Sequence, residues 1–377
     1  MGKKAVFISC FHYYDNRIAL VVEFLQKEGY ECYYITSDFD HIKKQTYSCQ
    51  VLGSIQIPTK PYRKNMSFDR IYSHFRFSRM AMERVECIQP DLVYVQFPPN
   101  SLCRVAAKYK RKYPEIRLIF DIYDLWPETF PSGRAKALLK IPFRIWGWLR
   151  NSGLPAADLI YTECGLYQKV LAKYLKDKKT QVLYLTRPGT TAGEFRPLPE
   201  EGVMQLCYLG SINNIIDIPA IAGLIQEIQK LRPVKLNIIG DGESRELLIT
   251  SVRETGAEVE YHGPIFDVDQ RQAIFDRCSF GINVMKESVC VGLTMKSLDY
   301  FAGGLPILNT IQADTWDLVE QEGIGVNLCR ENLTETAQKI CKMDSQTLKQ
   351  MRERTLEVFN RYFAKQRIMD VLSESLL

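Results

Sequence analysis

The chain has 377 residues, a length that suits two ordinary domains better than a single hydrophobic core. Hydrophobic residues make up 46% and charged residues 25%, which excludes a disordered chain, and no run approaches the roughly 18 apolar residues that span a bilayer. The net charge of +5 is modest for this size, so it does not require nucleic acid and leaves a phosphate-bearing ligand or an anionic membrane open as a partner.

Cysteines and histidines indicate neither a disulfide framework nor a metal centre. The eleven cysteines are scattered without a C-x-x-C pair, and most lie in apolar segments, as expected of reduced thiols in the cytoplasm. The four histidines, at positions 12, 41, 74 and 262, are too dispersed for a metal cluster. We therefore expect no metal and no cofactor beyond the substrates.

Short β-rich runs alternate with helical patterns from the start of the chain. Residues 6–10 predict a buried strand rather than a signal peptide, because the run is short and no small-residue cleavage site follows it. Residues 16–28 predict a helix, with Asp15 as its cap and Gly29 as its stop. Further strands are predicted at 31–36, 92–96, 118–121, 159–163 and 181–185. Several of these runs are apolar throughout, which is typical of a parallel sheet covered on both faces.

A stretch rich in proline and glycine then divides the chain into two halves of the same kind. From Arg187 it reads R-P-G-T-T-A-G-E-F-R-P-L-P-E-E. We expect one domain over residues 1–187 and a second over 188–360, with the site in the crevice that they share. The pattern restarts after the stretch, with strands predicted at 205–209, 235–239, 259–261, 281–284 and 306–309.

The turns after the strands of the second half have features of phosphate-binding loops. In doubly wound sheets, ligands gather outside the carboxyl ends of the strands, so these turns matter most. Gly210-Ser211 ends the first strand, before a helix that Asp217 is expected to cap, and Gly240-Asp241-Gly242 ends the next. Glycine lets a ligand approach the backbone, and helix amides favour anions. A tight turn requires glycine even when no ligand binds, so a purely structural role for these glycines is as well supported as a phosphate-binding one.

A third turn, over residues 292–306, combines more of these features. A glycine there precedes a helix whose first turn carries Thr294, Lys296 and Ser297, so that amides, hydroxyls and one ammonium converge on a diphosphate. Asp299 follows Lys296 by three residues and is placed to accept hydrogen bonds from sugar hydroxyls. The alternative is an amphipathic helix with a solvated Lys and Asp pair.

Residues 292–306 resemble the nucleotide-binding signature of the GT4-type retaining glycosyltransferases, in the form G-L-P-S-K-x-x-E-Y-x-A-x-G-x-P. Residues 121–128, D-I-Y-D-L-W-P-E, are similar to the D-x-R-D-L-W-P-E of bacterial polysaccharide-assembly members. The linker resembles their N-G-V-D-x-x-x-F-x-P, and residues 238–242 their I-I-G-D-G-P. The resemblance covers nearly the whole chain and implies the α/β GT-B fold, with two doubly wound Rossmann-like domains facing each other across a cleft. It also implies that the tail, 361–377, packs back on the first domain.

The resemblance implies a UDP- or GDP-sugar held mainly by the second domain and an acceptor held mainly by the first. Asp299 stands where the family has Glu and would bind the ribose, and Lys296 would act in catalysis by facing the departing diphosphate. Family members need no metal, because positive side chains and helix amides stabilise the leaving group. The other implied donor-binding residues are Gly210, Ser211, Gly240, Asp241, Gly242, His262, Gly263, Pro264, Glu287, Gly292, Leu293, Thr294 and Ser297.

Three features depart from the family pattern. Val291 stands where the first Glu of the E-x7-E signature belongs, and Glu287 lies nearby but off register. The loop after residue 209 lacks the usual Arg and Lys pair, and the first loop, 11–17, lacks the usual glycines. A catalytically weakened relative that serves as a nucleotide-sugar-binding subunit of a polysaccharide assembly complex therefore stays open as an alternative, and a nucleotide-sugar epimerase on the same architecture is a third possibility.

The acceptor site is expected from His12, Tyr13 and Arg17 of the first loop and from Trp126, with buried aromatic packing as the equal alternative for the loop. Asp124 follows a buried strand and precedes a proline-containing loop, so its carboxylate is expected to turn into the cleft and orient the acceptor or the donor sugar. A helix cap or a salt bridge is nearly as well supported for Asp124.

Two segments predict contact with a membrane. Residues 134–150 combine a basic stripe, Lys136, Lys140 and Arg144, with apolar and aromatic side chains over most of the remaining surface, as in an interfacial helix. Residues 63–79 are also basic and aromatic. A core helix with a charged outer edge is the alternative. We expect a cytoplasmic enzyme, peripheral to the inner face of the membrane, that elongates a lipid-linked glycan in surface polysaccharide synthesis.

Overall fold

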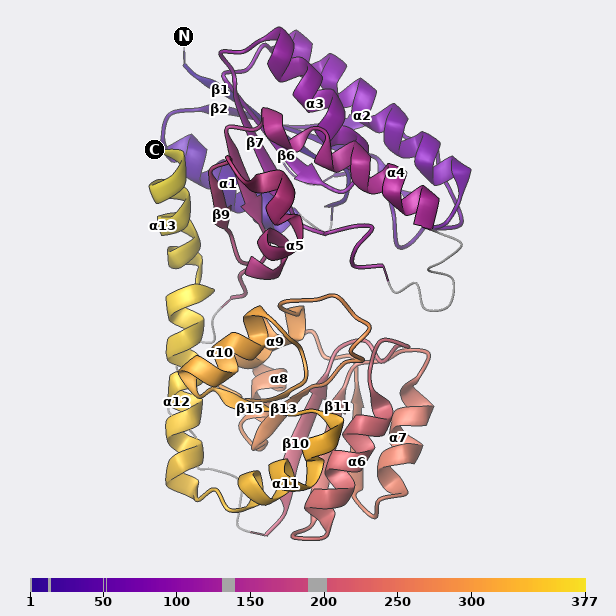
Figure 1. Cartoon of the computed structure of the whole chain (residues 1–377), viewed down its shortest axis with the longest axis vertical. Helices are drawn as coiled ribbons and strands as arrows, with labels where there is room; N and C mark the ends of the chain where they lie inside the picture. Colours follow the sequence, from indigo (N-terminus) through magenta and orange to yellow (C-terminus); the bar gives the residue numbers. More distant parts are fainter. Residues whose placement is uncertain (1, 13–14, 50, 52, 131–139, 189–201) are drawn as a thin grey trace. The chain divides into compact units, whose positions relative to one another are not determined.

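The structure is a computed structural model that describes residues 2–12, 15–49, 51, 53–130, 140–188 and 202–377 (Figure 1). The chain divides into two compact units, of which unit 1 comprises Met1–Tyr184 and Met369–Leu377 and unit 2 comprises Leu185–Ile368. Each unit is built on one parallel sheet with helices packed on it, which confirms the predicted class of two doubly wound α/β domains. Most of the linker, 189–201, lies outside the described residues.

The sheet of unit 1 has seven parallel strands in the order β5-β2-β1-β6-β7-β8-β9. Strand β1 lies between β2 and β6, so the strand order reverses there. Strand β5 was not predicted, because its S-I-Q-I sequence is short and mostly half-buried. The bounds are β1 Lys4–Ser9, β2 Glu31–Ser37, β5 Ser54–Ile57, β6 Leu92–Phe97, β7 Arg117–Ile122, β8 Leu159–Thr162 and β9 Thr180–Val182, with a small antiparallel pair β3 Phe39–Asp40 and β4 Gln45–Thr46.

The helices of unit 1 begin and end at residues that favour helix boundaries. Ser67 caps α2, because its side chain accepts a hydrogen bond from the backbone N–H of Arg70 at 3.2 Å. Gly29 has a φ of +82° and follows α1, as the predicted stop requires. The three helices α2, α3 and α4 pack in a row (Figure 1). The bounds are α1 Asp15–Lys27, α2 Phe68–Ile88, α3 Asn100–Lys112, α4 Lys140–Asn151, the 3₁₀ turn Leu154–Ala156 and α5 Gly165–Leu175.

The C-terminal residues Met369–Leu377 belong to unit 1. They form most of α13, Lys365–Leu376, and are joined to the sheet by hydrogen bonds. Arg117 at the start of β7 donates from Nη2 to the carbonyl oxygen of Ser375 at 3.1 Å, and the Tyr161 hydroxyl on β8 bonds the Ser375 hydroxyl. These contacts attach the end of the chain to β7 and β8.

The sheet of unit 2 has six parallel strands in the order β12-β11-β10-β13-β14-β15. Sequence predicted all of them except β15, which has three residues. The strand bounds are β10 Met204–Leu209, β11 Val234–Ile239, β12 Glu258–Gly263, β13 Phe280–Asn283, β14 Ile307–Asn309 and β15 Gly325–Asn327. The helix bounds are α6 Ile218–Gln229, α7 Arg245–Arg253, α8 Val268–Phe275, α9 Met295–Ala302, α10 Asp314–Glu322, the 3₁₀ turn Arg330–Asn332, α11 Leu333–Cys341 and α12 Ser345–Tyr362.

Burial of nearly continuous apolar strands holds each unit together. All six residues of β6 are buried, and β10 and β11 are buried except at their second residues. Each large apolar side chain buried in this way contributes about 1.5–3 kcal/mol.

Asp217 caps α6 by accepting a hydrogen bond from the Ala220 backbone N–H at 3.2 Å, as predicted. None of the helices in the described residues is both long and apolar enough to cross a bilayer.

Candidate functional site

The carboxyl ends of the unit 2 strands border a cavity of about 720 Å³, which we call the unit 2 cavity. It lies where the strand order reverses, because β10 has β11 on one side and β13 on the other. Its walls include the turns after β10, β11 and β12 and the start of α9. The predicted site residues that line it are Gly210, Ser211, Gly240, Asp241, Pro264, Thr294, Lys296 and Asp299.

The glycines of the first two turns differ in their roles. Gly240 has a φ of +141°, and a Cβ atom there would lie 2.0 Å from the carbonyl oxygen of Gly210. A Cβ atom on Gly242 would lie 2.3 Å from the carbonyl oxygen of Ile212. Packing of one turn against the other therefore requires Gly240 and Gly242 whether or not a ligand binds. At Gly210, φ is +108° and an added Cβ would meet nothing within 4 Å.

The start of α9 is organised by two hydroxyl groups. Thr294 caps the helix, because its Oγ1 accepts a hydrogen bond from the Ser297 backbone N–H at 3.2 Å. The same hydroxyl donates to Oδ1 of Asn283 at 3.1 Å and lies 2.6 Å from Oγ of Ser297. Ser297 is fully buried and is not among the residues that line the cavity. The structure thus gives Ser297 a part in the helix cap.

Lys296 is a buried cation that lines the unit 2 cavity. Its side chain is 8% exposed, and its Nζ atom lies 4.9 Å from the centroid of the Tyr208 ring. Among the described residues, this ammonium has no hydrogen-bond acceptor. Burial lowers the pKa of Lys296 to about 7. Because burying an uncompensated ammonium is costly, an anion bound in the cavity would stabilise its charged form.

Asp299 forms ion pairs with two arginines that the sequence analysis did not include in the site. Its Oδ1 atom lies 3.2 Å from Nε of Arg187 and 3.4 Å from Nη2 of Arg271. Burial raises the pKa of Asp299, and the two guanidinium groups oppose that rise. Both arginines line the cavity. The loop after β10 lacks the Arg and Lys pair of the family pattern, and these two arginines, from the linker and from α8, add cations to the cavity.

The end of the cavity nearest β12 is apolar. Pro264 lines it as predicted, together with Ile265, Phe266 and Val268. Phe266 is 89% exposed, which is unusual for a large aromatic side chain in a folded domain. An aromatic ring presented in this way offers a flat surface for stacking.

The remaining predicted donor residues do not line the cavity. His262 is half-buried in β12, with Nε2 3.1 Å from Oδ1 of Asn237, and burial lowers the pKa of its ring. Gly292 accepts hydrogen bonds at its carbonyl oxygen from the backbone N–H and the hydroxyl of Thr315. Glu287 is exposed. The predicted residues outside the described lining are Gly242, His262, Gly263, Glu287, Gly292, Leu293 and Ser297.

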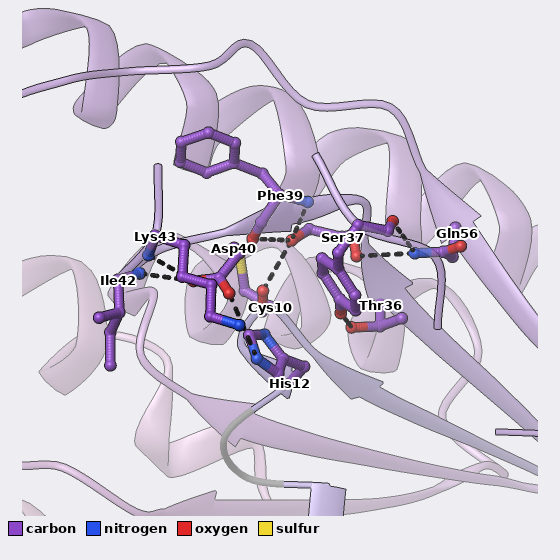
Figure 2. A network of polar contacts seen from close by, with 10 residues as sticks. Cys10, His12, Thr36, Ser37, Phe39, Asp40, Ile42, Lys43 and Gln56 are labelled. Atoms are coloured by element: carbon purple, nitrogen blue, oxygen red, sulfur yellow. Dashed lines mark hydrogen bonds and ion pairs between the residues drawn. The ribbon is translucent and has the colours of Figure 1, made fainter. Parts of the chain in front are cut away.

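In unit 1, the first loop is tied to β3, the short strand that follows β2 (Figure 2). His12 points toward Asp40, with Nε2 and Oδ2 3.7 Å apart. Asp40 also accepts hydrogen bonds at Oδ1 from the backbone N–H groups of Ile42 and Lys43, each at 2.8 Å. The predicted acceptor residue His12 thus faces a buried carboxylate, while Tyr13 lies outside the described residues.

Arg17 faces the interior of unit 1. It is 4% exposed, its Nε lies 3.4 Å from Oδ2 of Asp121, and its Nη1 donates to the carbonyl oxygen of Leu183. The guanidinium also lies 5.3 Å from the centroid of the Tyr123 ring. Protein groups therefore engage the side chain that was expected to contact an acceptor.

Asp124 follows β7 in unit 1 and is half-buried. Its Oδ1 accepts a hydrogen bond from the Thr129 hydroxyl at 2.8 Å, and burial raises its pKa. Burial also raises the pKa of Glu163, which follows β8, to about 8, with a further contribution from the charge of Asp124. Sequence analysis did not select Glu163, because a single carboxylate after a strand carries no motif.

A second cavity, of about 310 Å³, lies in unit 1 and is lined by residues of α2, of α4 and of the turn after β7. We call it the unit 1 pocket. The predicted acceptor residue Trp126 lines it. Beside it, α2 and α4 present exposed apolar side chains: Phe68, Ile71, Tyr72 and Phe75 on α2, and Ile141, Ile145 and Trp148 on α4.

The surface of α4 agrees only partly with the predicted membrane helix. Lys140 and Arg144 are exposed, as the basic stripe requires, whereas Leu149 and Arg150 are buried. Arg150 is held inside unit 1 by Glu128, with Nη2 and Oε1 2.6 Å apart. The helix therefore has one face in the domain and one face in solvent. Residues 131–139, which include Lys136, lie outside the described residues.

Residues 204–345, which form most of unit 2 and nearly all of its cavity, match the protein-family model described as Glycosyl transferases group 1. This part of the chain is therefore a glycosyltransferase domain. No curated protein sequence matches the chain at a significant level.

Solved glycosyltransferase structures share the fold over the whole chain. Sucrose-phosphate synthase of Thermosynechococcus elongatus superimposes with a TM-score of 0.69 at 12% identity, over 99% of this chain and 98% of that one. The lipopolysaccharide outer core galactosyltransferase WaaB superimposes with a TM-score of 0.67 at 15% identity, over 99% of each chain. HepE of Anabaena, solved with UDP and glucose, gives a TM-score of 0.63 at 13% identity, also over 99% of each chain. At these identities the likeness establishes the GT-B fold.

Proposed function

We propose that this glycosyltransferase is a retaining enzyme that moves a sugar from a nucleotide diphosphate to a hydroxyl of a lipid-linked glycan in surface or exopolysaccharide synthesis. The observation that carries the donor assignment is the buried Lys296 ammonium, which has no acceptor in the described part of the unit 2 cavity. A diphosphate supplies the oxygens and the negative charge that this ammonium lacks.

Charge complementarity supports a diphosphate in particular. Lys296, Arg187 and Arg271 place three cations around the cavity, and the described lining contains two carboxylates, Asp299 and Asp241. Negative charge accumulates on the diphosphate as the sugar leaves, and fixed cations stabilise that charge more than they stabilise the ground state. We propose that these cations, together with backbone amides, replace a metal ion in the reaction.

The rest of the nucleotide fits the two remaining parts of the cavity. Asp299 supplies a carboxylate for the ribose hydroxyls, and its orientation is fixed by Arg187 and Arg271. Phe266 and Pro264 supply an apolar surface for the nucleobase. The HepE structures of the same fold contain UDP, or UDP-glucose, which makes UDP-sugars the first donors to test.

We propose that Asp124 of unit 1 positions sugar hydroxyls during transfer. Its carboxylate is held by the Thr129 hydroxyl and by unit 1 packing, so its direction is defined before any substrate binds. Exposed apolar residues of α2 and α4, beside exposed Lys140 and Arg144, support peripheral contact with an anionic membrane, where a lipid-linked acceptor resides.

A transfer assay tests the proposed function. The full chain is incubated with radiolabelled UDP- and GDP-sugars and with a bacterial lipid extract, and labelled lipid is separated from free sugar. We expect metal-independent transfer from one donor class, with the donor's anomeric configuration retained in the product by NMR. Nucleotide binding without transfer or donor hydrolysis on any extract would contradict an enzymatic role.

A further inference from the structure

The unit 1 pocket has mainly apolar walls. Its volume is about 310 Å³, and Met66, Phe68, Ile71, Pro142 and Phe143 form much of its lining. None of the described residues that line it is an aspartate or a glutamate. The pocket is thus suited to a hydrocarbon group, and its described lining carries no negative charge that would repel an anion.

Two buried nitrogen-bearing side chains in the lining have no hydrogen-bond partner among the residues that the structure describes. His74 is 2% exposed, and neither of its ring nitrogens is paired among the described residues. The indole Nε1 of Trp146 is also buried and unpaired within that part of the chain, and the two rings lie 6.0 Å apart. Burying such groups without partners is costly, so a ligand that accepts their hydrogen bonds would recover that energy.

Arg70 places a positive charge in the same lining. Its side chain is mostly buried, and its guanidinium lies 5.0 Å from the centroid of the Trp126 ring. Nη1 of Arg70 donates to the carbonyl oxygen of Asn65 at 3.0 Å, which fixes the head group at the pocket. The positive charge and the two unpaired side chains together favour an anion.

The apolar surface continues out of the pocket. Phe68 is 91% exposed and Ile71 is 41% exposed, and both line the pocket from α2. On α4, Ile141 is 71% exposed and Ile145 is 56% exposed. A free phosphate would leave these side chains in water, whereas a hydrocarbon chain attached to the phosphate would cover them.

We propose that the unit 1 pocket binds the phosphate group of a single lipid, with the first carbons of its hydrocarbon chain against the pocket walls. Arg70, Trp146 and His74 donate to the phosphate oxygens, and Phe68 and Ile71 guide the chain toward the exposed surface of α2 and α4. The site deepens the proposed function by naming the chemical class of the acceptor carrier, and only that identification as a carrier rests on the proposed function.

Binding of geranyl monophosphate to the full chain tests the site. Geraniol and inorganic phosphate are the two control ligands, and they separate the contribution of the hydrocarbon from that of the phosphate. Affinities are measured by calorimetry below the micelle concentration. The test variant is Ile71→Asp, a half-exposed pocket position that tolerates a charge. The matched control is Cys87→Asp, at an exposed position near the other end of α2 and outside the described lining.

We expect geranyl monophosphate to bind at least tenfold more tightly than either control ligand. Ile71→Asp is expected to weaken it at least tenfold, and Cys87→Asp to change it less than twofold. The site is refuted if geranyl monophosphate does not bind, if inorganic phosphate or geraniol binds equally well, or if both variants weaken binding to the same extent. Titration of UDP on the same samples separates the outcomes, because UDP binding without lipid phosphate binding refutes this site alone.

Discussion

The unit 2 cavity and the unit 1 pocket have opposite chemistry although both belong to parallel α/β units. The cavity is lined largely by turns at the carboxyl ends of strands, and it gathers Lys296, Arg187 and Arg271. The pocket is lined largely by the side chains of two helices, and apart from Arg70 its described lining carries no charged residue.

The difference shows that strand ends and helix faces suit different ligands. Turns bring backbone amides and short polar side chains to one point, which favours phosphate groups. Helix faces bring rows of apolar side chains, which favour hydrocarbon. The contrast supports unit 2 as the site of the activated sugar and unit 1 as the site of the carrier lipid. Each of the following variants removes one charged group or one group of apolar side chains.

Replacing Lys296 by methionine should have the largest effect. The variant keeps the length of the side chain and removes the charge proposed to stabilise the leaving diphosphate, so we expect kcat/KM to fall about 100- to 1,000-fold. Transfer rates measure this loss. Lys230→Met, at the exposed residue that directly follows α6, is the control and should be within twofold of wild type. Equal activity of both variants would show that the diphosphate lies elsewhere.

Asp124→Asn should reduce kcat about 10- to 100-fold, because it removes one charged hydrogen bond to a sugar hydroxyl and keeps the shape of the side chain. UDP affinity should stay within twofold, since Asp124 belongs to unit 1 and the nucleotide is assigned to unit 2. Calorimetry measures the UDP affinity and initial rates measure kcat, so the effect on binding is separated from the effect on transfer. A parallel loss of UDP affinity would contradict the assignment.

Asp299→Asn should weaken nucleotide binding about tenfold, because a carboxylate that accepts ribose hydroxyls is lost. The wild type should prefer UDP over 2′,3′-dideoxy-UDP, and the variant should lose that preference. Comparison of the four affinities isolates the hydroxyl contact. If the preference persists in the variant, Asp299 serves only to hold Arg187 and Arg271.

Nucleotide affinity should fall about fivefold between pH 7 and pH 8. The pKa of Lys296 is lowered to about 7 by burial, so the free enzyme loses this proton as the pH rises, and a diphosphate must draw it back on binding. The unfolded chain keeps the proton up to the ordinary lysine pKa, so this group makes the unliganded protein more stable as pH rises from 7. Calorimetry in two buffers should show proton uptake on UDP binding, and the uptake should be absent in Lys296→Met.

The combined change Ile145→Ser and Trp148→Ala should reduce sedimentation with anionic vesicles about threefold, because it removes two exposed apolar groups from α4. Val170→Ser, an exposed position on α5, is the control. If wild type and both variants sediment equally, or if none sediments, α4 does not bind the membrane.

The features that the sequence could predict are those determined by a short continuous stretch of residues. The apolar runs that became β6, β10 and β11 specify buried strands by themselves, and Asp217 specifies a helix start. Lys296 and Asp299 could be selected because the turn and its helix form one continuous motif.

The missed parts depend on packing between distant segments. Arg271 reaches Asp299 from another helix, and nothing in its own neighbourhood indicates that partner. Ser297 was expected in the cavity, yet it lies one turn after Thr294 and shares the helix cap with it. The unit 1 pocket requires His74 and Trp146 to meet across two helices, which no local pattern reveals.

A crystal structure of the enzyme with bound UDP tests the central assignment most directly. We predict phosphate oxygens within hydrogen-bonding distance of the Lys296 ammonium and the uracil ring against Phe266. A nucleotide bound on another surface, with Lys296 still lacking a partner, would contradict the account.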